Sequence, residues 1–345
     1  MQGKSGEWTG KLPLSRLAEV LRRAGRRRGG STLVGPSTGE DAAVINLGPI
    51  DLVMHIDPIT EAGELAGRLA VHVAANDIAV TGAKPRWVML AVLMPQGSPQ
   101  ESLERIMEDA VRAAEEVEVE IVGGHTEAAP GVRRAIVVAA AAGVTCGGCT
   151  TPTSSARPGD AIIQVKPAGI EGTAIIATDF AGLLRELGLG EEVIAGGRMM
   201  AGMVSVVREA VELAELGVVS AMHDPTEGGL VGGLVEMAIA SRTVIEVDEA
   251  KILVAEPTRI IARSLGVDPL KLISSGTLIA AVPQGRLGEA SFVLEELGVE
   301  YSVIGRVVEH TPSPKLVLRR SDGSTEEVRE PPMDEIARLH QEAGV

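Results

Sequence analysis

The sequence contains few aromatic residues: two tryptophans, two phenylalanines and one tyrosine among 345 residues. Proteins that stack the bases of single-stranded nucleic acid need clusters of such rings, so this scarcity argues against that class. Positive charge is also short, because 32 lysines and arginines face 47 acidic residues and leave a net charge of −15. Such a surface repels phosphate backbones and anionic lipids. We therefore expect neither a nucleic acid nor a membrane as a partner.

Long apolar runs and cysteines are scarce as well. The longest apolar stretch, residues 135–144, has about half the length that a membrane-spanning helix needs. No basic segment followed by an apolar run opens the sequence, so we expect no signal peptide and a cytoplasmic protein. Cys146 and Cys149 are the two cysteines, which excludes a disulfide-rich secreted domain. One such pair supplies only two zinc ligands, and we expect two free thiols, with a disulfide as the alternative.

The length and the 45% apolar content predict a packed protein of two domains or one large one. A break rich in glycine, proline and small residues covers 147–159 and predicts a linker. We expect an amino-terminal domain over 1–146, a carboxy-terminal domain over 155–320 and a tail with a helix over 321–345. Strands and helices mix in both halves, which predicts an α+β fold.

The apolar spacing places the individual elements. We expect helices at about 12–25, 65–81, 99–117, 170–186, 191–216, 256–265, 286–297 and 333–342, and a further helix that opens at 227–229. We expect strands at 42–46, 52–55, 87–94, 119–122, 134–144, 160–165, 243–247, 277–282, 301–308 and 315–318.

Four aspartates lie in turns of small residues or in an alanine-rich helical run: Asp41, Asp57, Asp77 and Asp224. A carboxylate in such apolar surroundings is costly to bury without a partner. Carboxylate oxygens suit Mg²⁺ and the phosphates that it bridges. Each aspartate taken alone could equally cap a backbone turn. The four together predict a cation and phosphate site, provided that they converge in space.

Two glycine pairs are candidate phosphate contacts. Gly123 and Gly124 follow an apolar run and precede polar residues, so their backbone N–H groups could face a ligand, or they could simply end a strand. Gly228 and Gly229 open an apolar helix, which indicates either an anion site or close helix packing.

These segments together resemble the aminoimidazole ribonucleotide (AIR) synthase superfamily, and most closely its hydrogenase-maturation HypE branch and the archaeal relatives of that branch. The resemblance runs in order over about residues 10–310. It rests on Gly-Glu-Asp-Ala-Ala-Val (39–44), Asp-Pro-Ile-Thr (57–60), the helical segment 70–83, Gly-Gly-His-Thr-Glu (123–127), Arg-Pro-Gly-Asp (157–160), Gly-Ile-Glu-Gly-Thr-Ala (169–174) and His-Asp-Pro-Thr-Glu-Gly-Gly (223–229). It implies an AIR synthase-like fold, a homodimer joined through a barrel of amino-terminal strands, and a cleft for ATP and Mg²⁺.

The resemblance also implies roles for single residues. The metal ligands would be Asp41, Asp57, Asp77 and Asp224. The nucleotide contacts would be Lys11, Asp41, Asp57, Asn76, Asp77, Gly123, Gly124, His125, Thr126 and Glu127. The catalytic groups would be Asp224, His125 and Lys11, with Lys11 on an amino-terminal arm that folds over the nucleotide.

The chain departs from the HypE pattern at two places. HypE proteins carry the reacting group on a carboxy-terminal cysteine, whereas no cysteine follows Cys149 in this sequence. Ser274, Ser275 and Gly276 stand where HypE proteins tend to have Asn-Glu-Gly. We predict an ATP- and Mg²⁺-dependent phosphoryl-transfer or dehydration enzyme that acts on a separate acceptor, with a maturation protein as a candidate partner. The alternatives are a non-catalytic nucleotide-binding dimer in metalloenzyme maturation and AIR synthase itself.

Overall fold

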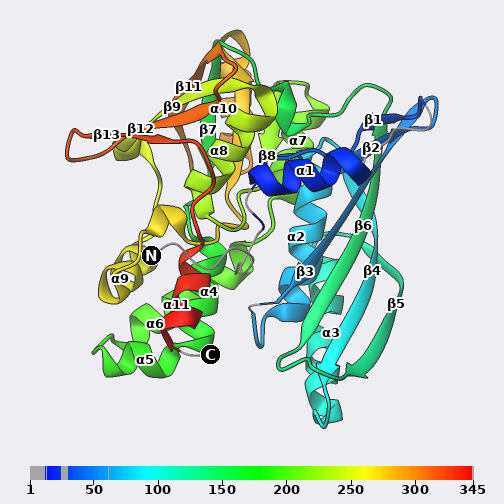
Figure 1. Cartoon of the computed structure of the whole chain (residues 1–345), viewed down its shortest axis with the longest axis vertical. Helices are drawn as coiled ribbons and strands as arrows, with labels where there is room; N and C mark the ends of the chain where they lie inside the picture. Colours follow the sequence, from blue (N-terminus) through cyan, green and yellow to red (C-terminus); the bar gives the residue numbers. More distant parts are fainter. Residues whose placement is uncertain (1–11, 13, 25–29, 61, 344–345) are drawn as a thin grey trace.

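The computed structural model describes residue 12 and residues 14–24, 30–60 and 62–343. The described chain forms two β-sheets with helices packed between and around them (Figure 1). This α+β arrangement confirms the fold class expected from the sequence. Within the described ranges, no helix is long and apolar enough to cross a membrane.

The amino-terminal half is built on a six-stranded sheet of order β1-β2-β3-β6-β4-β5. Its elements are α1 (Leu14–Ala24), β1 (Thr32–Val34), β2 (Ala43–Asn46), β3 (Ile50–Ile59), α2 (Ala66–Val80), β4 (Lys84–Pro95), α3 (Gln100–Glu116), β5 (Glu120–Ala129) and β6 (Ile136–Cys146). The buried helix α2 contacts β3, β4 and β6 from one side of the sheet, so this sheet has one covered face.

The carboxy-terminal half is built on a seven-stranded sheet of order β13-β12-β9-β11-β7-β10-β8. Its strands are β7 (Asp160–Val165), β8 (Ala221–His223), β9 (Thr243–Asp248), β10 (Leu278–Pro283), β11 (Tyr301–His310), β12 (Lys315–Arg319) and β13 (Thr325–Val328). Its α-helices are α4 (Ile170–Asp179), α5 (Ala181–Glu186), α6 (Glu191–Met199), α7 (Val207–Glu215), α8 (Gly229–Ser241), α9 (Glu256–Leu265), α10 (Leu287–Glu296) and α11 (Glu335–Ala343). Five short 3₁₀ turns complete it: η1 (Thr153–Ser155), η2 (Met200–Met203), η3 (Glu249–Lys251), η4 (Pro269–Lys271) and η5 (Gln284–Arg286).

The two halves share an apolar core, and the carboxy-terminal half has a second one of its own. Helix α2 is alanine-rich and almost wholly buried, because small side chains let other elements approach it from all sides. A Cβ atom on Gly67 would lie 2.0 Å from the carbonyl oxygen of Ile106, so α2 and α3 are in backbone contact there. On its other side α2 contacts α7 and β8 of the carboxy-terminal half. The centre of the molecule is therefore a single helix that both halves cover.

Most of the expected elements are present, with three kinds of difference. The helices expected at 170–186 and 191–216 are each broken into shorter pieces. Three short strands, β1, β8 and β13, were not expected. The strand expected to end at Val122 continues as β5 to Ala129, through the glycine pair. The limits expected for the two domains stay a prediction.

The expectation of two free thiols is wrong, because Cys146 and Cys149 form a disulfide. Strand β6 ends at Cys146, and the chain turns back so that the Cys149 N–H donates to the Cys146 carbonyl oxygen over 3.1 Å. Gly148 makes this turn possible with a φ of 82°. The Cα atoms come to 5.3 Å, within the range that a disulfide spans. Sequence spacing alone does not specify such a turn.

We predict that titration of the unfolded, unreduced protein detects no free thiol and that both thiols appear after reduction. Because the closed loop is short, the disulfide contributes roughly 2 kcal/mol of unfolding free energy in the chain-entropy model. Urea unfolding of the Cys146→Ser, Cys149→Ser protein should show this loss. Two reactive thiols in the unreduced protein would contradict the prediction.

Candidate functional site

Helix α2 directs two consecutive polar residues toward different neighbouring elements at the centre of the molecule. Asn76 and Asp77 are consecutive, so they lie about 100° apart around the helix. Asn76 contacts the carboxy-terminal half, and Asp77 contacts strand β3. The helix therefore connects polar groups from both halves at one level.

Asn76 fixes Asp224, which follows strand β8. The Asn76 Nδ2 group donates to Asp224 Oδ2 over 3.0 Å and to the Val204 carbonyl oxygen over 2.9 Å. The Asn76 Oδ1 atom accepts from the Val206 N–H over 2.8 Å. Burial raises the pKa of Asp224 well above its usual value, and the charge of Asp77 raises it further. The Asp224 Oδ1 atom is buried and has no hydrogen-bond partner in the described part of the chain, so it is available to a ligand.

Strand β3 supplies His55, which lies between two of the predicted acids. Alternation along the strand places His55 and Asp57 on the face that packs against α2. The His55 Nε2 atom lies 3.0 Å from Asp77 Oδ2, and its Nδ1–H donates to the Asp41 carbonyl oxygen over 2.5 Å. Burial alone would lower the pKa of His55, but the Asp77 carboxylate outweighs it and raises the pKa to about 9. A charged His55 therefore neutralises Asp77 at neutral pH.

A second histidine pairs with Asp41 across the two halves. The His223 Nδ1 atom lies 2.8 Å from Asp41 Oδ1, and its Nε2 atom lies 3.2 Å from Glu236 Oε2. Thr153, in the segment that links the halves, donates from Oγ1 to Asp41 Oδ2 over 3.0 Å. Burial disfavours the charged ring, but Asp41 and Glu236 outweigh it and raise the pKa of His223 well above its usual value. A charged histidine between two carboxylates thus joins β8 and α8 to the residues before β2.

Three of the four predicted acids are close enough to influence one another. Burial raises the pKa of Asp41, and the charge of Asp77 adds to that increase. The charges of both Asp41 and Asp77 raise the pKa of Asp224. The charge of Asp57 raises the pKa of His55. The structure therefore gathers the four aspartates around His55 and α2, while their roles stay a prediction.

The donor set has the chemistry that Mg²⁺ prefers, but the described residues do not form a complete cage. In the described part of the chain, no three histidine, cysteine, aspartate or glutamate side chains are arranged to hold a metal ion. Asp41 and Asp77 are already paired with histidines. Mg²⁺ at nucleotide sites commonly uses one or two carboxylates together with substrate phosphates and water. Asp224, with its unpartnered buried oxygen, fits that smaller requirement.

The predicted phosphate-side residues lie elsewhere in the same chain. Gly123, Gly124, His125, Thr126 and Glu127 are all in β5, at the edge of the sheet. Two strands separate β5 from β3, which corresponds to about 14 Å between them. His125 pairs with Ala91 on the sheet face opposite to the one that carries His55 and Asp57. One chain alone does not bring the β5 residues to the aspartates.

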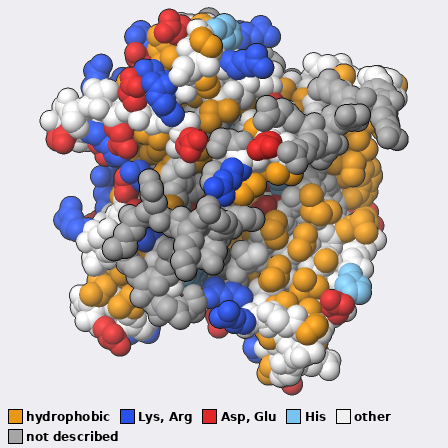
Figure 2. All heavy atoms as spheres, in the orientation of Figure 1, with side chains coloured by type: hydrophobic (Ala, Val, Ile, Leu, Met, Phe, Trp, Pro, Cys, Tyr) orange, Lys and Arg blue, Asp and Glu red, His pale blue; other side chains and the backbone are white. Residues whose placement is uncertain are grey.

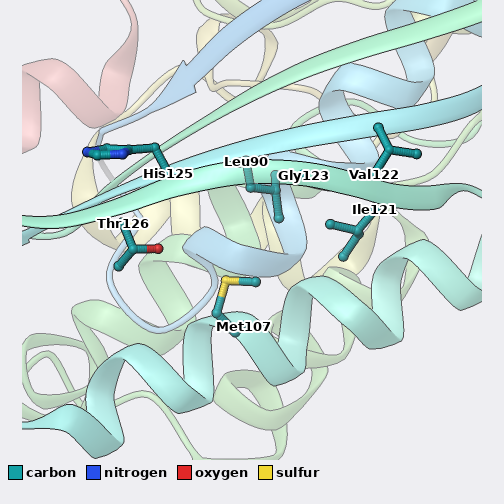
Figure 3. Close-up of a pocket in the computed structure, with 8 residues that line it drawn as sticks. Leu90, Met107, Ile121, Val122, Gly123, His125 and Thr126 are labelled. Atoms are coloured by element: carbon teal, nitrogen blue, oxygen red, sulfur yellow. The ribbon is translucent and has the colours of Figure 1, made fainter.

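Strands β4 and β5 and helix α3 line an open pocket of about 440 Å³. Met107, Ile121 and Thr126 lie on its inner side, whereas His125 points away (Figure 3). A Cβ atom on Gly124 would lie 2.0 Å from the Leu90 carbonyl oxygen, so strand packing requires this glycine. Close packing between strands, and not contact with a phosphate, therefore accounts for Gly124.

Two further sequence predictions concern the ends of the site. Lys11 lies outside the described residues. The Gly228 N–H donates to Asp334 Oδ2 over 2.8 Å, so a carboxylate of the chain already occupies it. A Cβ atom on Gly229 would lie 2.6 Å from the Leu270 carbonyl oxygen. Close packing thus explains this glycine pair.

Sequence reasoning assigned no role to several polar groups that lie in or beside the cluster of aspartates: Thr153, His223, Glu236, Glu171 and Ser275. His223 could have been found from its position directly before Asp224, and Glu171 from the Gly-Ile-Glu-Gly segment. Thr153 and Glu236 carry no comparable signal in the sequence.

The outer face of the amino-terminal sheet is apolar and exposed. Alternation places Met54 and Ile56 of β3 and Trp87 and Met89 of β4 on this face. Ile56 is 66% exposed and Met89 is 52% exposed. Figure 2 shows hydrophobic side chains gathered over the region where Figure 1 places β3 to β6. Such a patch on a chain of net charge −15 marks an interaction surface.

Comparison with known proteins gives a consistent result over both halves. The model of the AIR synthase related protein, N-terminal domain, matches residues 39–145, and that of its C-terminal domain matches residues 157–314. The carbamoyl dehydratase HypE of Azotobacter vinelandii is 33% identical over 282 residues, which cover 78% of either protein.

Solved structures show the same likeness. A crystal structure of the hydrogenase maturation protein HypE in complex with ATP has a TM-score of 0.70 and 28% identity, covering 86% of this chain and 88% of that chain. A crystal structure of a HypE–HypF complex has a TM-score of 0.72 and 25% identity, covering 90% and 97% respectively.

Proposed function

The chain belongs to the AIR synthase related family, and we propose that it is an ATP- and Mg²⁺-dependent enzyme that transfers phosphate to an amide-type acceptor on a separate molecule. The observation that carries this proposal is the gathering of Asp41, Asp57, Asp77 and Asp224 around α2, at the junction of the two halves. The ATP complex of HypE and the name carbamoyl dehydratase of a relative support the nucleotide and the acceptor class.

Different residues of the chain would bind the metal ion, position its ligand and limit the negative charge of the cluster. Asp57 and Asp224 are the carboxylates that would hold Mg²⁺, which neutralises phosphate charge when bound. Asn76 holds Asp224 in place through a buried hydrogen bond. His55 and His223 limit the negative charge of the cluster by pairing with Asp77 and Asp41. Acceleration would come from positioning and from charge neutralisation in a site with little water.

The acceptor would be supplied by another molecule. Self-modification would require a free thiol, but both cysteines of the sequence are joined in the disulfide. An amide oxygen is a poor leaving group and a phosphate a good one, which is why ATP activates such acceptors. A maturation protein that presents a carbamoyl group is a candidate partner, because a HypE relative crystallises with HypF.

We also propose a homodimer formed through the outer face of the amino-terminal sheet. This face is apolar and continuous over neighbouring strands. A second copy would cover it, and it would bring the β5 residues of one chain to a surface shared with the other. The separation of β5 from the aspartates within one chain is consistent with a site completed by dimerisation.

The direct test is calorimetry with a non-hydrolysable ATP analogue and Mg²⁺, followed by measurement of ADP formation with carbamoyl compounds. We expect binding that requires Mg²⁺ and ADP release that requires the acceptor. Binding without ADP formation would favour the alternative of a non-catalytic nucleotide-binding dimer, which the pairing of Asp41 and Asp77 with histidines also favours. No binding at all would contradict both.

A further inference from the structure

Glu171 is a buried carboxyl group that the cluster of aspartates does not use. It lies in the first turn of α4 and is 2% exposed. Its Oε2 atom has no hydrogen-bond partner within the described ranges. Leaving a buried polar atom without a partner costs about 1–3 kcal/mol, so folding alone does not favour a glutamate here.

A second buried polar group adjoins Glu171. Ser275 is fully buried, and no other described group is hydrogen-bonded to its Oγ atom. Its side chain forms a hydrogen bond with the Glu171 carboxyl, which lowers the pKa of Glu171. Two neighbouring buried groups, one carboxyl and one hydroxyl, therefore both have unused hydrogen-bonding capacity.

The backbone around this pair is held firmly. Gly169 begins α4 with a φ of 74°, and its N–H donates to Ser274 Oγ over 2.6 Å. The Gly172 N–H donates to the Ile273 carbonyl oxygen over 3.0 Å. These bonds join the first turn of α4 to residues 273–274 and fix Glu171 relative to Ser275.

The same turn adjoins the cluster of aspartates. A Cβ atom on Gly276 would lie 2.8 Å from Val204 Cα, so the turn is in direct contact with that backbone. The Val204 carbonyl oxygen accepts from Asn76, which holds Asp224. The negative charge of Asp57 also raises the pKa of Glu171. Glu171 and Ser275 thus border the cluster of aspartates.

We propose that Glu171 and Ser275 form a subsite that binds the uncharged amide group of the acceptor; this rests on the function proposed above. A primary amide presents a C=O acceptor and an N–H donor side by side. A protonated carboxyl and a hydroxyl offer the complementary donor and acceptor positions.

The charge around Glu171 supports this assignment. Burial raises the pKa of Glu171 to about 8, and the charges of Glu227, Asp334 and Asp57 add to that increase. The carboxyl is therefore mostly uncharged at neutral pH and can donate a hydrogen bond. Nearby carboxylates disfavour a ligand that is itself an anion. An uncharged amide gains two hydrogen bonds without burying a new charge.

The test is binding of S-methyl thiocarbamate, a small uncharged probe, measured by ligand-detected NMR with the ATP analogue and Mg²⁺ present. S-methyl thioacetate, which lacks the NH₂ group, is the matched control probe. We expect the thiocarbamate to bind the natural protein about 10-fold more tightly than the thioacetate, because one hydrogen bond is lost. Equal binding of the two probes, or no binding of the thiocarbamate, would overturn the proposal. So would preferential binding of methylguanidinium, which would indicate a cation site.

Three variants separate binding from structure. Glu171→Gln keeps donor and acceptor positions and should retain the thiocarbamate, whereas Glu171→Leu and Ser275→Ala should each weaken it about 10-fold. Glu171→Leu should also raise the melting temperature, because it removes an unpartnered buried carboxyl. A lower melting temperature with unchanged probe binding would mean that Glu171 is structural, and would overturn the subsite.

ADP formation keeps this proposal apart from the proposed function. If the natural protein binds the thiocarbamate through Glu171 but forms no ADP, the subsite stands and the proposed function fails. If Glu171→Leu and the natural protein form ADP equally well with the thiocarbamate, the function stands and the subsite fails.

Discussion

Replacement of Asp224 by asparagine is expected to lower ATP turnover by about 10²–10³-fold while the protein stays folded. The asparagine can still accept the hydrogen bond from Asn76, so the local structure should persist. It cannot supply the carboxylate that bound Mg²⁺ would favour over the protonated form. Because the Asp224 carboxyl is buried with one oxygen unpartnered, its loss should not reduce the free energy of unfolding. ADP formation and urea unfolding of the same samples measure the two effects.

Asp57 and Asp51 form a matched pair for this experiment. Both lie in β3 and on the same face of the strand. Asp57 belongs to the proposed site, whereas Asp51 accepts from Asn46 Nδ2 and the Gly148 N–H at the other end of the strand. We expect Asp57→Asn to lose turnover as Asp224→Asn does. Asp51→Asn should lose about 1–3 kcal/mol of stability and keep its turnover per folded molecule.

Unchanged turnover in both Asp224→Asn and Asp57→Asn would be incompatible with the proposed site. The cluster of aspartates would then be a structural network that the two histidines neutralise.

Introduction of a lysine at Ile56 is expected to convert a dimer into a monomer at concentrations where the natural protein is dimeric. Ile56 lies on the exposed apolar face of β3, two residues after Met54, and its side chain points away from α2. In a two-fold dimer each substitution occurs twice, so two lysines would be buried without partners. The dissociation constant should rise at least about 100-fold. Sedimentation velocity over a range of concentrations measures it.

Phe292→Lys is the matched control for the dimer experiment. Phe292 is a large apolar side chain of α10 with 61% exposure, in the carboxy-terminal half. We expect its replacement to leave the dimer unchanged. A natural protein that is monomeric at all concentrations would refute the dimer. If both lysine substitutions weakened the dimer equally, the outer sheet face would not be the interface.

Features that repeat locally could be predicted from the sequence. The helical spacing around Asn76 and Asp77 and the alternation around Asp57 predicted α2 and β3, because both patterns follow from which side of an element is buried. The alternation typical of a strand did not indicate where β5 ends. A glycine pair in an apolar run fits a turn as well as it fits a strand whose neighbour approaches closely, as at Gly124.

The sequence by itself determined the α+β class, the family and the four aspartates as candidates, because each depends on residue type and short-range order. Only the tertiary structure decided which groups meet. It paired Asp41 with His223 across 182 positions, joined Asn76 to Asp224, and buried Glu171 beside Ser275, with the Glu171 Oε2 atom lacking a partner among the described residues. It also placed His125 on the opposite face of the sheet from Asp57. The physical reason is that contacts between distant segments depend on how helices and sheets pack, and a linear pattern carries no direct record of that packing.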